Sequence, residues 1–376
     1  MKWQKVKLGD VCECLGKGKH PASFSDIKGT YPFIVSGLSE KKCNEYDNDD
    51  ECFIIGDGGC ANIHYVNGKY AASDHTYIFK SKDDRILTKY IYKYLSGNIR
   101  ILEDGFKGAG IKNISKSYIM SILIPLPPKE KQERIAKELD AVSDLLAKQK
   151  QLLTEQDTLI KATFYDMFGD LVTNNRNWLI SNIGDNLDVL TDYHANGSYE
   201  TLKNNVTLHD SPNFALMIRT TDLEKNDFVH DVKYIDEHAY NYLSKSKVFG
   251  GEIIINKIGS AGKVYLMPKL NRPVSLAMNQ FLLRFHKNIN HIFVYYLLVS
   301  EFYTSKIQEN VKGAVTKTIT KDAIRDIKIP VPPLPLQQKF ADIVEQIEAQ
   351  KQKIKSAITE TEILFNALMA KYFDEE

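Results

Sequence analysis

The sequence predicts an α+β protein made of two α/β globular domains and two long helices, with this arrangement repeated once along the chain. Two observations carry the prediction. Residues 124–128 read Ile-Pro-Leu-Pro-Pro and residues 329–333 read Ile-Pro-Val-Pro-Pro, and a long segment with coiled-coil spacing follows each copy. Because proline fixes φ and lacks an N–H donor, each copy should be an extended arm that leads into a helix.

The segments that follow the prolines have apolar residues at alternating steps of four and three, which is typical of paired helices. From Gln132 and Gln337 onward they contain no Gly or Pro, and each helix would be roughly 50–57 Å long. Gln149, Gln156 and Lys351 are polar residues in the seam that would set its register. The predicted helix-pairing residues are Ile135, Leu139, Val142, Leu146, Leu153, Ile160, Phe340, Val344, Ile347, Ile354, Ile358 and Phe365.

Length and composition are those of an ordinary globular protein with more than one domain. The chain has 376 residues, 43% of them hydrophobic, and a net charge of +1. A charge near zero argues against a DNA-binding protein that acts alone, so any DNA contact would need local basic patches or a basic partner. The start of the chain shows no signal peptide, and the apolar runs at 251–255 and 294–299 are too short to span a bilayer, so we expect a cytoplasmic protein and no membrane partner.

Five cysteines lie in the first third of the chain. Their odd number and the absence of secretion signals favour free thiols over disulfides. Zinc stays an alternative because two of them form a Cys-x-Cys pair, but no Cys-x-x-Cys spacing supports a metal site, and we expect none. The cysteines are Cys12, Cys14, Cys43, Cys52 and Cys60.

Along the first half, β-branched and aromatic runs predict strands at 31–35, 52–55 and 77–79, and helical spacing predicts a helix at 87–95. Asn67-Gly68 predicts a hairpin turn between strands at 63–66 and 69–72. Residues 119–124 should form the strand before the proline arm. The acidic run at 47–51 is interpreted as a solvated loop, with a magnesium site as the alternative.

The second half repeats the first at offsets that change along the chain. Trp3 corresponds to Trp178 at an offset of 175, whereas the Lys-Gly-Ala stretches at 107–109 and 312–314 correspond at 205. The proline arms and the helices keep the offset of 205, so the second globular part carries 30 extra residues. The helices therefore match while the globular parts have diverged, which indicates a common scaffold that carries two different binding heads; drift after an old duplication is the alternative.

No catalytic motif fits its context. Gly56-x-Gly58 follows a strand but leads into a predicted hairpin, so it offers no helix N-terminus to a dinucleotide. The stretch at 259–263 resembles part of a phosphate-binding loop but lacks the spacing, and a strand follows it. Histidines occur singly, and the Asn-Pro-Pro-Tyr or Asn-Pro-Pro-Phe motif of adenine methylation is missing.

What remains is a set of polar, glycine-supported loops at matching places in both halves. Such loops carry donors suited to phosphates and base edges, and glycine permits close approach to a nucleic acid. Taken singly, each loop is more often a plain surface loop. The candidate DNA-binding residues are Lys17, Lys19, His20, Asn62, His64, Lys107, Lys112, Arg219, Lys257, Ser260, Lys263, Asn279, Lys312 and Lys317.

Taken together, these features resemble the specificity subunit of a type I restriction–modification system. The resemblance covers nearly the whole chain. It is carried by the two proline arms with Gln132 and Gln337, by the Leu-Gly-Asp and Ile-Gly-Asp stretches at 8–10 and 183–185, and by the stretches at 219–223, 257–263 and 279–280. The first half departs from the family at 56–60, where a Gly-x-x-Gly-Lys run is expected.

This resemblance implies a division into target recognition domain 1 (1–126), a first conserved helix (127–168), target recognition domain 2 (169–331) and a second conserved helix (332–376). The helices would pair antiparallel and fix the distance between two half-sites of double-stranded DNA. It further implies that the chain itself is non-catalytic and has no cofactor. Two methyltransferase subunits carrying S-adenosylmethionine, and restriction subunits using ATP and Mg²⁺, would supply adenine methylation and cleavage.

Outside the predicted seam, Leu145, Leu152 and Leu159 are apolar residues that the partner subunits could cover. Two other interpretations stay open. One is a structural coiled-coil adaptor with two protein-binding heads, which would show no salt-dependent DNA binding. The other is an enzyme with an unrecognised site.

Overall fold

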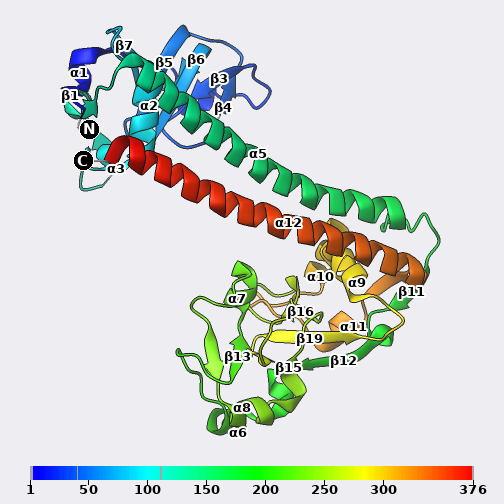
Figure 1. The fold of residues 1–376 in the computed structure, drawn as a ribbon. Coiled ribbons are helices and arrows are strands. Elements are labelled where there is room, and N and C mark those ends of the chain that lie inside the picture. The colour runs from blue at the N-terminus through cyan, green and yellow to red at the C-terminus, as the bar shows by residue number, and fades with distance from the viewer. Residues whose placement is uncertain (1–2, 40, 111, 375–376) are drawn as a thin grey trace. The chain divides into compact units, whose positions relative to one another are not determined.

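The computed structural model describes residues 3–39, 41–110 and 112–374. It divides into two compact units, residues 1–152 with 354–376 and residues 153–353. Each unit contains one globular head and part of both long helices (Figure 1). We call residues 1–126 the first head and residues 169–331 the second head.

The first head is built on a six-stranded sheet of order β2-β7-β5-β6-β3-β4, antiparallel except where β3 meets β6. Two small pairs, β1 with β10 and β8 with β9, complete its strands. The strands are β1 Lys5–Lys7, β2 Cys12–Lys17, β3 Tyr31–Ile34, β4 Lys41–Cys43, β5 Asn48–Gly56, β6 Ile63–Ala72, β7 Thr76–Ser81, β8 Phe106–Lys107, β9 Asn113–Ile114 and β10 Leu123–Pro125. The helices are α1 Leu8–Val11, α2 Thr88–Gly97, α3 Arg100–Glu103 and α4 Lys116–Ser121.

The second head contains two four-stranded sheets, of orders β12-β19-β16-β17 and β14-β13-β18-β15, and the pair β11 with β20. The strands are β11 Leu179–Asn182, β12 Leu187–Asp192, β13 Ala215–Ile218, β14 Lys233–Ile235, β15 Lys247–Val248, β16 Ile253–Asn256, β17 Val264–Leu266, β18 Val274–Leu276, β19 Gln280–Phe285 and β20 Lys328–Val331. The helices are α6 Tyr199–Asn205, α7 Thr220–Lys225, α8 Glu237–Tyr242, α9 His291–Leu298, α10 Glu301–Glu309 and α11 Lys321–Arg325.

The two heads share one four-stranded framework. The order β2-β7-β5-β6 in the first head matches β12-β19-β16-β17 in the second, and the registers agree: Lys17 pairs with Tyr77 as Asp192 pairs with Phe281. In the first head the long strands β5 and β6 continue this sheet into β3 and β4, whereas in the second head the equivalent strands form a separate sheet, β14-β13-β18-β15, and α6 and α8 are added. The predicted internal repeat is therefore confirmed, and the heads differ in what they add to the common sheet.

The long helices are α5 Lys129–Phe168 and α12 Leu334–Met369, the latter continued by a π-helical stretch, Ala370–Asp374. They run antiparallel within each unit (Figure 1). In the first unit, Tyr372 donates a hydrogen bond to Glu138, and the Gln149 side-chain amide donates to Thr361 Oγ1 over 3.2 Å. In the second unit the Phe340 ring packs 5.2 Å from that of Phe164.

The predicted helix-pairing residues differ in burial according to where they lie. Most of those near the head-bound ends are buried in the head cores: Ile135 and Leu139 in the first unit, Ile160, Phe340, Val344 and Ile347 in the second. Phe365 is partly buried and packs against the first core. Those nearer the middle of each helix are only partly buried: Val142, Leu146, Leu153, Ile354 and Ile358. The seam prediction omitted Phe164, which is 3% exposed and lies in the second core.

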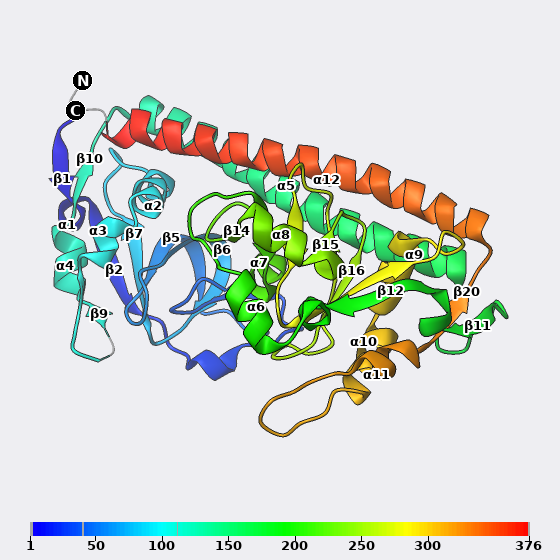
Figure 2. The ribbon, with the colours of Figure 1, turned by 90° about the horizontal axis from the view of Figure 1, so that it is seen from below.

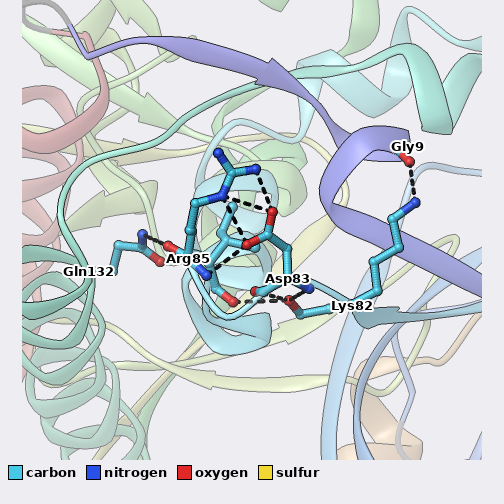
Figure 3. A network of polar contacts seen from close by, with 7 residues as sticks. Gly9, Lys82, Asp83, Arg85 and Gln132 are labelled. Atoms are coloured by element: carbon cyan, nitrogen blue, oxygen red, sulfur yellow. Dashed lines mark hydrogen bonds and ion pairs between the residues drawn. The ribbon is translucent and has the colours of Figure 1, made fainter.

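Gln132 and Gln337 attach each long helix to its own head. Both are fully buried. The Gln132 amide donates to the Arg85 and Pro127 carbonyls and its Oε1 accepts from the Leu87 N–H, beside the turn that carries Asp83 and Arg85 (Figure 3). Gln337 repeats this, donating to the Pro332 carbonyl and accepting from the Asn290 N–H. Each glutamine thus satisfies backbone groups of both the proline arm and the head.

Three local predictions were wrong. Asn67-Gly68 is not a hairpin turn, because β6 runs through it and pairs with β5 at Glu51 and Asp50. The acidic run is not a solvated loop, since most of it forms the start of β5, where Glu51 accepts a hydrogen bond from Tyr65 and Asp50 faces Lys80. Residues 119–121 belong to α4, which Ser115 caps, and only β10 is strand.

The five cysteine thiols are free. Burial raises the pKa of Cys12 and of Cys52 to about 12, so both stay protonated at neutral pH, whereas Cys60 is exposed. Within the described residues, no three His, Cys, Asp or Glu side chains gather closely enough to hold a metal ion. Across those residues, no helix combines the length and apolarity that crossing a bilayer needs.

Candidate nucleic-acid interface

Both heads end in an equivalent hairpin just before the last short helix. In the first head β8 pairs with β9, with Lys107 opposite Asn113. In the second head Lys312 and Thr318 exchange two backbone hydrogen bonds of 2.9 and 2.8 Å. The hairpin tips place four of the candidate residues, Lys107 with Lys112 and Lys312 with Lys317, in exposed positions.

A loop with a glycine in the left-handed region lies beside each hairpin. Gly59 and Gly259 both have φ of +85°. In the first head the Ile114 N–H donates to the Asp57 carbonyl over 3.0 Å, and in the second the Ile319 N–H donates to the Lys257 carbonyl over 3.2 Å. Hairpin and loop therefore form one surface in each head, and Asp57 and Lys257 occupy equivalent places.

These equivalent places carry an ion pair of opposite polarity. In the first head Asp57 on the loop pairs with Lys17 at the end of β2. In the second head Lys257 on the loop pairs with Asp192 at the end of β12, over 3.2 Å. Each pair joins the loop to the edge strand of the common sheet. The ion pair thus lies at the same place in both heads, but the lysine is on the strand in the first head and on the loop in the second.

Neighbouring groups favour the charged form of Asp192 in the second pair and of Lys17 in the first. Burial alone would raise the pKa of Asp192, but Lys321, at 3.0 Å, and Lys257 together hold that pKa below its usual value. The hydrogen bond to Asp57 raises the pKa of Lys17. Asp192 and Lys17 therefore carry their charges at neutral pH, and Lys17, Lys257 and Lys321 each face a carboxylate of their own head.

We expect that the charges of Lys17 and Asp57 can be exchanged without loss of stability only if both residues are changed together. Lys17→Asp would place a second carboxylate beside the buried Asp57 and destabilise β2 locally by about 1–2 kcal/mol, less than for a fully buried pair because Lys17 is half exposed. The double variant Lys17→Asp/Asp57→Lys should recover most of this loss. Hydrogen exchange of the β2 amides measures it, and a double variant as labile as the single one would contradict the prediction.

The side chains of the remaining candidates of the first head contact other residues of the same head. His20 stacks on Phe24 with ring centres 3.7 Å apart and lies 2.7 Å from Asp47, which Lys19 also approaches, at 3.8 Å. Asn62 is fully buried, where it accepts from the Gly56 N–H and donates to the Cys60 carbonyl. His64 Nε2 lies 2.8 Å from the Gly37 carbonyl oxygen. Asn62 and His64 thus shape the loop.

In the second head, Arg219 and the 257–263 loop form a connected polar group. Arg219 is the N-cap residue of α7, and both its guanidinium, at 2.7 Å, and its backbone N–H, at 2.8 Å, donate to the Asp222 carboxylate. Ser260 accepts from the Asn256 amide and donates to Glu224, which Lys263 approaches at 3.5 Å. Asn279 is exposed, and its backbone carbonyl accepts from the Lys257 N–H.

An open, mainly apolar pocket of about 500 Å³ lies next to this group. Two of its lining residues, Arg219 and Asn279, were among the candidates predicted from the sequence. The others were not, because the walls come from segments far apart in the sequence. The aromatic pair just after β12 was the available signal. The missed residues include Tyr193, His194, Tyr199, Leu208 and Met278.

A family model described as "Type I restriction modification DNA specificity domain" matches residues 1–155 and 175–361. These two matches cover most of the chain and correspond to the two halves of the repeat. The chain belongs to this family. The resemblance inferred from the sequence is confirmed: the chain confers DNA sequence specificity in a type I restriction–modification system, and members of this family are non-catalytic.

Other members of the type I specificity family match nearly end to end. The Methanocaldococcus jannaschii type I restriction enzyme MjaVIII specificity subunit is 24% identical, over 92% of this chain and 86% of that protein. The Escherichia coli EcoDI specificity subunit is 23% identical, over 100% and 88%. The crystal structure of the S subunit from M. genitalium has the same fold, with a TM-score of 0.68 at 16% identity over 100% of this chain and 97% of that one.

Proposed function

We propose that each head reads one half of a split DNA site and that the paired helices set the separation of the two halves. The observation that carries the proposal is the construction of the heads: one common framework, with different additions on it. A framework that is kept can hold the DNA in the same way at both half-sites. Additions that differ can then read different bases.

In the second head, the apolar pocket and the polar group around Arg219 are the surfaces that we assign to base reading. Its rim combines aromatic rings and Met278 with Asn279, which suits contact with base edges and thymine methyl groups. The sheet β14-β13-β18-β15 has the strand order and directions of β4-β3-β6-β5 in the first head, but the second head packs α6 and α8 against it.

We assign the chemistry to partner subunits. A pair of methyltransferase subunits with S-adenosylmethionine would methylate adenine, and restriction subunits using ATP and Mg²⁺ would cleave. Leu145, Leu152 and Leu159 on α5 are 45%, 41% and 49% exposed, and their seven-residue spacing returns them to one face of the helix. Such a stripe supports the docking of a partner helix.

Exchange of one head tests the function. In a host that carries the partner genes, deletion of this chain should abolish one adenine methylation motif of the genome. Replacing the whole second head, residues 169–331, with the equivalent segment of a relative should change one half of that motif and leave the other half and the spacer unchanged. Genome-wide methylation sequencing measures both. An unchanged motif after deletion would favour the structural adaptor, and a change in both halves would contradict reading by separate heads.

A further inference from the structure

The hairpins at 106–114 and 311–319 keep one sequence pattern, with five of nine residues identical, in two heads that otherwise differ. Both contain the pattern Lys-Gly-Ala-x-x-Lys-x-Ile at an offset of 205. Each is followed by a helix with a hydroxyl cap, Ser115 accepting from the Tyr118 N–H and Thr320 accepting from the Ala323 N–H, both over 3.2 Å. Figure 2 shows the two loops projecting, one beside β9 and one beside α11.

The geometry of the tips depends on glycine. Gly108 has φ of +143° and Gly313 has φ of +111°, which side-chain-bearing residues rarely adopt. A Cβ on Gly313 would lie 2.1 Å from the Thr316 carbonyl oxygen. The tip is therefore a tight turn with exposed backbone beside a lysine, an arrangement that lets the chain approach a flat anionic surface closely.

The charges at the tips are uncompensated. Lys107, Lys112, Lys312 and Lys317 are exposed, and none has an ion-pair partner among the residues that the structure describes. This separates them from Lys17, Lys257 and Lys263, which face carboxylates of their own head. Of all the candidate lysines, these four are the ones whose charge is fully available to a partner.

A surface that is the same on two differently specific heads should meet the part of the target that is the same at both half-sites. In DNA that part is the sugar-phosphate backbone. Two copies of one partner protein would also present identical surfaces. However, the tips share two lysines, a glycine and an alanine but no large apolar residue at a matching position, since Val315 in the second head corresponds to Gly110 in the first and Ile111 in the first corresponds to Thr316 in the second. This composition favours phosphate over a protein interface.

We propose that the two hairpin tips grip DNA phosphates in the same way at both half-sites, without reading bases. The proposal rests on the proposed function of the heads. Each hairpin is bonded to the adjacent glycine loop, with the Gly59 N–H donating to the Lys112 carbonyl over 3.2 Å in the first head. Binding of the DNA phosphates at the tip would therefore fix how far the base-reading surfaces of the same head reach into the DNA groove.

Salt titration of DNA binding by the complete complex with its methyltransferase subunits tests this proposal. The variants are Lys107→Gln/Lys112→Gln, Lys312→Gln/Lys317→Gln and the four combined. The matched control is Lys269→Gln/Lys287→Gln, two exposed lysines of the second head without an ion-pair partner among the described residues. Because each phosphate contact contributes about 0.9 to the slope of log K against log salt, the slope should fall by about 1.8 for each pair and about 3.6 for all four.

Affinity for target and for unrelated DNA should fall by the same factor, and the methylated motif should stay the same. A wild-type slope in the variants would overturn the proposal, as would a changed motif, which would show base reading, or loss of methyltransferase subunits from the complex, which would show a protein interface. If the wild-type complex itself showed no preference for any site, the proposed function would fail instead.

Discussion

The combined substitution Leu145→Glu/Leu152→Glu/Leu159→Glu is expected to abolish co-purification with methyltransferase subunits while the chain stays folded. The three side chains are nearly half exposed, so charging them costs the isolated chain little. In a docked complex the same carboxylates would be desolvated against apolar surface, which costs several kcal/mol for each unpaired charge. Co-expression with the partners, affinity purification and circular dichroism of the free chain measure the two effects.

The matched control for the leucines is Gln151→Glu/Thr154→Glu/Thr158→Glu. It adds the same negative charge at exposed positions of α5 outside the leucine stripe. We expect this variant to assemble normally. Assembly of the leucine variant would remove α5 as the docking face, and failure of both variants would show that charge on the helix, and not the apolar stripe, decides docking.

Replacing Phe340 with alanine is expected to destabilise the second unit by about 3–5 kcal/mol, the usual range for a large aromatic residue lost from a core. Phe340 is fully buried, and its ring lies 5.2 Å from Phe164, 5.4 Å from Phe168 and 5.5 Å from Tyr296. It thus joins α12 to both α5 and α9, so a cavity there removes contacts from three helices at once.

Hydrogen exchange of the α9 amides measures the Phe340 effect within the second unit, where a single unfolding temperature would mix several transitions. Tyr165→Ala is the control, since Tyr165 lies on the same aromatic stretch of α5 but is 47% exposed. It should change α9 exchange only slightly. Equal effects from both substitutions would show that burial at Phe340 is not what stabilises this helix junction.

The repeat and the long helices could be predicted from the sequence because their signals are local and periodic. Proline arms and heptad spacing act on neighbouring residues, and they gave α5 and α12 with nearly correct bounds. The wrong predictions fell where strand pairing outweighed local preference. Asn67-Gly68 favours a turn, yet pairing with β5 extends β6 through it, and only the φ of +112° at Gly68 retains that preference.

The sequence could predict which loops carry the candidate residues, but not which of those side chains form ion pairs within the heads. Residue type placed lysines beside glycine in both halves, and the structure keeps four of them exposed at the hairpin tips. Which other lysines are neutralised depends on partners far away in the sequence, such as Asp192 for Lys257. The pocket was missed for the same reason, because its walls come from separate segments that only the fold brings together.

The opposite polarity of the Lys17–Asp57 and Asp192–Lys257 pairs restricts how genes of this kind can exchange segments. A crossover that joined β2 of one half to the glycine loop of the other would set two lysines, or two carboxylates, face to face. A crossover within the heptad segments would carry each pair along intact. Viable recombinants should therefore inherit a recognition module whole, with their breakpoints confined to the helices.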